Sequence, residues 1–165
     1  METMVLENYI QMAEKAFDNN DYAQGMKYLE EVLMLEPHYG KAHNHMGWLY
    51  IYSMKDWAKA ETHLNLAMKY APNYAPVYLH MSHILFEQGR FKDLEKLLEK
   101  ASQTGGIQKT FIWGMRAKVK EVSGQYRKAI KLTKKAIKWC LDDQEFQNLK
   151  KDITRCRKKR LAQLF

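Results

Sequence analysis

Three histidines are the residues whose type and spacing come closest to a metal site. His80 and His83 are three positions apart, which places both imidazoles on one face of a helix, and His45 precedes them by about one structural unit. Imidazole nitrogens grouped in this way can coordinate Zn²⁺ or Ni²⁺. No cysteine or close carboxylate completes the ligand set. We therefore expect no metal and no cofactor, and interpret these histidines as hydrogen-bonding groups.

The other reactive groups form no catalytic constellation. Cys140 and Cys156 are the only cysteines, too few for a disulfide framework or a thiolate metal site, and reduced thiols are the simplest interpretation. No nucleophile with its base, no glycine-rich phosphate loop and no carboxylate pair can be assembled. The sequence predicts a protein that is not an enzyme.

Charge is divided unevenly along the chain. Residues 1–88 carry 6 basic and 11 acidic groups, whereas residues 89–165 carry 21 basic and 8 acidic groups, within a net charge of +8. The basic residues form a stripe at helical spacing and then a dense cluster: Arg127, Lys131, Lys134, Lys138, Lys150, Lys151, Arg155, Arg157, Lys158, Lys159 and Arg160. Such a field attracts an acidic protein, anionic lipid or nucleic acid, although a solvated helix face explains it equally well. Nucleic acid is the least expected of these partners because no recognition motif is present.

The elements that must position these residues recur along the chain. A polar or glycine-containing turn followed by an aromatic residue occurs four times, and the aromatics are 34 or 35 residues apart: Tyr22, Trp57, Phe91 and Tyr126. The segments between them place apolar residues at helical spacing, without the alternation of strands. A period near 34 predicts stacked helix–turn–helix units.

In this register the sequence resembles the tetratricopeptide repeat family. The second unit carries the family pattern most fully, with Gly47 and Tyr50 on its first helix, Ala60 and Ala67 on its second, and Pro72 after it. Small residues recur where the two helices of each unit cross: Ala13, Gly47, Ser82 and Ala117.

The resemblance implies an all-α fold, a right-handed α-solenoid of stacked antiparallel helix pairs with a C-terminal capping helix. Residues 1–143 are expected to form four repeats, at about 6–39, 40–74, 75–109 and 110–143, and residues 144–165 a basic amphipathic capping helix. Two departures stand out. One extra residue between Tyr50 and Trp57 predicts a longer turn, and Gly105-Gly106 replaces the usual proline and predicts a bend.

The resemblance also implies that the first helices line a concave groove for a partner peptide or helix. The residues that helical spacing projects onto it are Asn44, His45, Trp48, Tyr52, Leu79, His80, His83, Phe86, Met115 and Lys118. Aromatic rings supply rigid contact area, and amides and imidazoles supply hydrogen bonds. The alternative is that Trp48, Tyr52 and Phe86 simply pack between units.

One subfamily binds acidic chaperone tails through a clamp of lysine, asparagine and arginine. The corresponding stretches here offer Ile10, Glu14, His45, Pro76 and Leu79, so the clamp is absent. A different peptide is therefore expected in the groove.

These observations predict a non-enzymatic scaffold or adaptor for protein–protein interaction. The alternative function is a basic adaptor for nucleic acid or an anionic membrane through residues 116–160. Self-association through opposite charges, and docking by the apolar tip of Leu161, Leu164 and Phe165, are both left open. The N-terminus resembles no signal peptide and no apolar run is long enough to span a membrane, so we expect a soluble cytoplasmic protein.

Overall fold

The computed structural model describes residues 2–163, and over that range it contains helices and no strand. The chain divides into two compact units, Met1–Ile84 and Leu85–Phe165. The all-α class predicted from the sequence is confirmed. Leu164 and Phe165, two of the three residues of the predicted apolar tip, lie outside the described residues, and Leu161 is exposed near the end of the last helix.

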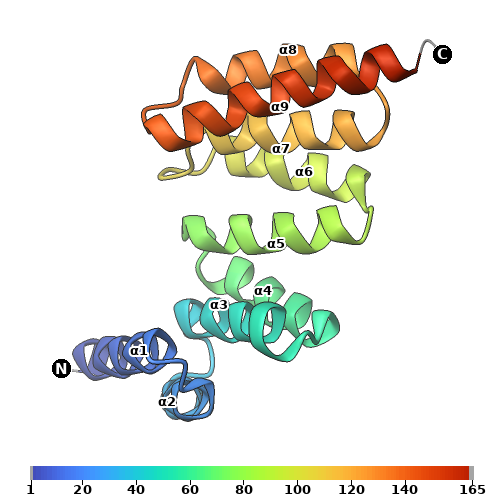
Figure 1. Cartoon of the computed structure of the whole chain (residues 1–165). Coiled ribbons are helices and arrows are strands. Elements are labelled where there is room, and N and C mark those ends of the chain that lie inside the picture. Colours follow the sequence, from blue (N-terminus) through green and yellow to red (C-terminus); the bar gives the residue numbers. More distant parts are fainter. Residues whose placement is uncertain (1, 164–165) are drawn as a thin grey trace. The chain divides into compact units, whose positions relative to one another are not determined.

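The first unit is built from antiparallel helix pairs. Its elements are α1 (Glu2–Asp18), α2 (Tyr22–Leu35), α3 (Gly40–Leu49), the π-helix η1 (Tyr50–Met54), α4 (Trp57–Tyr70) and the part of α5 (Ala75–Glu87) that ends at Ile84. Helix α1 packs on α2, and α3 packs on α4 (Figure 1). Gly47 permits the second pairing, because a Cβ atom there would lie 2.7 Å from the Leu64 side chain. Leu29, Leu49 and Leu64 are completely buried between these helices.

The second unit begins within α5 and continues through four further helices. These are α6 (Phe91–Ser102), α7 (Lys109–Val122), α8 (Tyr126–Ile137) and α9 (Asp143–Ala162). Helix α7 packs on α8, and α9 lies along α8 (Figure 1). The apolar side of α9 is buried at Leu149, Ile153 and Cys156, the residues whose spacing predicts an amphipathic helix. Asp142 caps this helix by accepting a hydrogen bond from the Glu145 amide.

The turns within the helix pairs share one backbone device. The four aromatics of the 34-residue period are the first residues of α2, α4, α6 and α8. Two positions before each of them stands a residue with positive φ: Asn20 (60°), Lys55 (57°), Gly89 (68°) and Gly124 (70°). Glycine adopts this left-handed conformation without a Cβ penalty. The two non-glycine turns are each followed by an aspartate, Asp21 or Asp56, whose side chain caps the next helix.

The two departures from the repeat pattern have different structural outcomes. The expectation of a longer turn after Tyr50 is wrong, because the extra residue is wound into the π-helix η1 and the turn keeps its usual Lys55-Asp56 form. The Gly105-Gly106 pair lies in the irregular connection between α6 and α7, where Gly106 has a φ of 79°.

None of the helices within residues 2–163 combines the length and the apolar composition needed to cross a bilayer.

Candidate partner-binding site

A pocket of about 410 Å³ in the first unit collects side chains from α1, α3 and the start of α5. We call it the unit-1 pocket. Its lining residues are Glu14, Phe17, Asp18, Tyr22, Asn44, His45, Trp48, Tyr74, Pro76 and His80. Four of the predicted groove residues therefore meet there: Asn44, His45, Trp48 and His80.

The wall of the unit-1 pocket is aromatic. The Trp48 ring centroid lies 5.2 Å from that of Phe17 and 6.4 Å from that of Tyr22. On its other side Trp48 contacts Tyr52, whose ring in turn stacks on His83 at 5.7 Å. Rings held by neighbours in this way present a rigid surface that loses little side-chain entropy on binding.

A glycine makes the inner position of Phe17 possible. Gly25 of α2 is buried, and a Cβ atom at this position would overlap the Phe17 ring. The missing side chain at Gly25 therefore leaves room for the Phe17 ring, whose centroid lies within 6.2 Å of those of Trp48 and Tyr22.

The pocket also contains buried polar groups. Asn44 is 2% exposed, and its Oδ1 has no hydrogen-bond partner among the described residues. His45 Nε2 lies 3.4 Å from Glu14 Oε1 without forming a hydrogen bond. A buried amide oxygen without a donor is costly, so the pocket favours an occupant that brings one.

The imidazoles in the pocket are neutral near pH 7. Burial lowers the pKa of His45. Burial, together with repulsion from His45 and His83, lowers the pKa of His80 to about 4. The formal charge of the lining therefore comes from the carboxylates of Glu14 and Asp18 alone.

The remaining predicted groove residues lie elsewhere. Leu79 is exposed on α5, and Tyr52 and His83 flank the pocket through their mutual stacking. Phe86 belongs to the second unit, where it packs against Phe91. Met115 and Lys118 also belong to that unit and line a different cavity.

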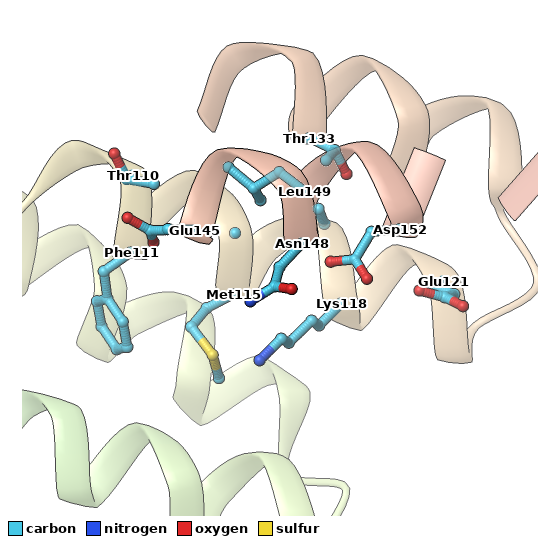
Figure 2. Close-up of a pocket in the computed structure, with 12 residues that line it drawn as sticks. Thr110, Phe111, Met115, Lys118, Glu121, Thr133, Glu145, Asn148, Leu149 and Asp152 are labelled. Carbon is cyan, nitrogen blue, oxygen red and sulfur yellow. The ribbon is translucent and has the colours of Figure 1, made fainter. Parts of the chain in front are cut away.

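That second cavity, of about 200 Å³, lies among α7, α8 and α9. Figure 2 shows Met115 and Lys118 projecting from α7, with Asn148 and Asp152 approaching from α9. Thr110 is buried at one end, and its Oγ1 has no hydrogen-bond partner in the described chain.

The predicted histidine trio does not form a metal site in the structure. Over residues 2–163, no three histidine, cysteine or acidic side chains are grouped closely enough to hold an ion. The structure instead reveals a different pair, in which the Nδ1 atoms of His43 and His63 are 3.0 Å apart. His43 Nε2 lies 3.0 Å from the Pro37 carbonyl oxygen. Because a carbonyl oxygen only accepts, His43 Nε2 must be the donor in this contact. His43 Nδ1 therefore accepts a hydrogen bond from Nδ1–H of His63.

The predicted basic patch contains two kinds of cation. On α8, Arg127, Lys131 and Lys134 are exposed, and the helix contains no acidic residue. On α9, Arg155 and Lys159 instead bind Glu121 of α7, at 2.6 and 2.8 Å.

Glu121 is only 8% exposed, and its hydrogen bonds to Arg155 and Lys159 lower its pKa to about 2. These two cations therefore join α9 to α7. The other predicted members are exposed: Lys138, which follows α8, and, on α9, Lys150, Lys151, Arg157, Lys158 and Arg160.

Asp18 and Tyr74 also line the pocket, and neither is among the predicted groove residues. Asp18 is four positions after Glu14 on the same helix, so helical spacing places both carboxylates on one face and could have indicated Asp18. Tyr74 lies in the connection before α5, where no periodicity could indicate it.

Comparison with known proteins defines the fold. No protein-family model and no curated protein matches the sequence. Several solved structures resemble it, and three of them serve as examples. PilF of Pseudomonas aeruginosa is 17% identical, with a TM-score of 0.77 over 96% of this chain and 74% of that one. PilW, described as a widely conserved type IV pilus biogenesis factor, is 17% identical, with a TM-score of 0.77 over 97% and 78%. MamA is 16% identical, with a TM-score of 0.69 over 96% and 91%.

At these identities the likeness concerns the fold alone. The chain is an all-α helical-repeat protein. Its repeats have the tetratricopeptide type of fold, as the residue pattern predicted.

Proposed function

We propose that the chain is a non-enzymatic interaction scaffold that holds a segment of a partner protein in the unit-1 pocket. The four predicted repeats and the capping helix are its framework. The observation that carries the proposal is the pocket itself, which combines a rigid aromatic wall with the buried Asn44 amide, whose oxygen has no hydrogen-bond partner within the described residues. A preformed surface of this kind spends little ordering entropy on binding.

Selection from a displayed library of short random peptides tests this function. Peptides that bind the wild-type chain are expected to lose at least about tenfold in affinity for Trp48→Ala, because truncated aromatic anchors commonly cost 2 kcal/mol or more. Trp139→Ala is the matched control, since Trp139 is exposed and lies in the second unit. Thermal melts establish that both variants fold. Failure to select any peptide, or equal binding by Trp48→Ala, would contradict the proposal.

A second candidate function is attachment of the second unit to an anionic membrane. The observation that favours it is an exposed apolar connection after α8, in which Leu141 is 100% exposed and Trp139 is 51% exposed. Tryptophan is favoured at membrane–water interfaces, and each lysine near an anionic leaflet contributes about 1 kcal/mol. Lys138 directly precedes this connection in sequence, and Lys134 lies one helical turn before Lys138.

Vesicle sedimentation tests the second candidate. Vesicles containing phosphatidylserine are expected to bind the chain, and phosphatidylcholine vesicles are not. Binding of a duplex oligonucleotide without binding of the vesicles would replace the membrane by nucleic acid as the partner of this surface.

A further inference from the structure

We propose that the unit-1 pocket selects a cationic side chain, arginine or lysine, presented by the partner segment. This inference rests on the proposed function of the same pocket, and it names the chemistry that the pocket recognises. Three independent features support it: the charge of the lining, the faces of the aromatic rings, and the buried acceptor in the lining.

The charge of the lining is negative and uncompensated. Glu14 is about half exposed, and the imidazole of His45, which lies 3.4 Å from its carboxylate, is neutral near pH 7. Asp18, one helical turn later, has no ion-pair partner within the described chain. No lysine or arginine lines the pocket.

The nearest basic residue of α3 is already engaged elsewhere. Lys41 binds Glu7 of α1, and the Tyr39 hydroxyl donates to the same carboxylate. These hydrogen bonds lower the pKa of Glu7. The contrast separates Glu7, whose charge is compensated inside the unit, from Glu14 and Asp18, whose charges remain available to a ligand.

The aromatic wall adds an attraction of the same sign. The face of an aromatic ring carries negative potential and attracts a cation placed over it. Phe17, Tyr22 and Trp48 are grouped with centroids 5.2–6.4 Å apart, beside the two carboxylates. Arginine suits this combination best, since its planar guanidinium stacks on a ring while its N–H groups bind a carboxylate.

The lining also holds a buried hydrogen-bond acceptor without a partner. Asn44 contributes to the unit-1 pocket, and its Oδ1 accepts no hydrogen bond within the described residues. Guanidinium and ammonium groups only donate. A carboxylate occupant would face like charges and another acceptor, which excludes the acidic C-terminal tail as the favoured ligand.

Replacement of the charged group in the selected peptides tests the inference. The peptides chosen by display are expected to share an arginine or lysine. Changing that arginine to citrulline keeps the shape and removes the charge, and it is expected to weaken binding at least about fivefold. The indole N–H signal of Trp48 in ¹H–¹⁵N spectra should shift with the arginine peptide, and that of Trp139 should not.

The protein side of the contact has a matched control. Glu14→Gln combined with Asp18→Asn is expected to weaken the arginine peptide at least about fivefold and to remove its advantage over the citrulline form. Glu30→Gln combined with Glu31→Gln makes the same change of charge on exposed positions of α2 and should leave binding unchanged. Equal affinities for arginine and citrulline, or an unaffected Glu14/Asp18 variant, would overturn the inference.

The outcomes separate the two claims made for this pocket. Selected peptides that lack arginine and lysine, yet depend on Trp48, would overturn the cationic specificity and leave the proposed function standing. An empty selection would remove both. Light scattering at low salt addresses a second copy as the source of the cation: a monomer supports a separate partner, whereas association lost in the Glu14/Asp18 variant would replace that partner with another copy of this chain.

Discussion

The unit-1 pocket and the exposed face of α8 place charge in opposite ways on the same kind of helix pair. The pocket sets two carboxylates beside aromatic rings and a buried amide. Helix α8 sets its cations in open solvent, with no acidic residue in its sequence. The difference suggests that the pocket recognises by shape and by a few desolvated groups, whereas α8 recognises by an additive field that salt screens.

Two glutamates sharpen the same contrast. Glu14 is exposed, and the imidazole of His45 beside it is neutral near pH 7. Glu121 is buried and accepts hydrogen bonds from Arg155 and Lys159. One carboxylate is available for binding, and the other stabilises the packing of α9 on α7.

Overpacking the core of the first unit is the largest disruption that we predict. Ala67 of α4 is completely buried, so Ala67→Trp should lower the free energy of unfolding by about 3 kcal/mol or more. A thermal melt measures this, with Ala58→Trp on an exposed position of the same helix as the control. An unchanged melt for Ala67→Trp would contradict the helix register on which the pocket depends.

Acid should weaken the two units in different pH ranges. A histidine whose pKa is lowered in the folded state stabilises above its unfolded pKa, so the contribution of His80 is lost as the pH falls from 6.5 to about 4. The contribution of Glu121, whose pKa is also lowered, is lost as the pH falls from 4.5 to about 2. Each loss amounts to roughly 2–3 kcal/mol.

The indole signals of Trp57 and Trp113 report on the first and second unit in an acid titration. As the pH falls, we expect the indole signal of Trp57 to leave its native chemical shift before that of Trp113. His80→Gln should move the transition followed by Trp57 to lower pH. Glu121→Gln should change the transition followed by Trp113. Loss of Trp113 before Trp57 would reverse the predicted order.

Local chemistry explains which parts of this comparison the sequence could predict. The helix starts at Trp57 and Phe91 followed from an aromatic at a fixed offset after a turn. The π-helix η1 did not, because one surplus residue can lengthen a turn or widen a helix, and only packing decides between them.

The same distinction holds for the candidate sites. Helical spacing alone brought Asn44 and Trp48 to one face, and both line the pocket. The burial of Glu121 depends on partners 34 and 38 residues away. Neither spacing nor composition could indicate that pairing.

Charge reversal on α8 should separate the two surfaces. Lys131→Glu combined with Lys134→Glu is expected to weaken binding to phosphatidylserine vesicles at least about thirtyfold, at roughly 1 kcal/mol for each lysine lost. Raised salt should have a similar effect. Peptide affinity at the unit-1 pocket should not change. Lys15→Glu combined with Lys27→Glu, at exposed positions of α1 and α2, is the control for net charge. Unchanged vesicle binding would exclude α8 from the membrane contact.

The smallest effect is expected at Leu141, in the apolar connection between α8 and α9. Leu141→Ser removes a side chain that is 100% exposed, so the free energy of unfolding should change by less than about 0.5 kcal/mol. Vesicle binding should nevertheless fall about fivefold, because part of the leucine side chain is buried on contact with the interface. If this segment serves only to connect α8 and α9, the free energy of unfolding and the vesicle binding should both stay unchanged. Loss of stability without loss of vesicle binding would mean that Leu141 packs within the protein. The contrast between the aromatic pocket and an exposed, lipid-facing surface would then rest on the cations of α8 alone.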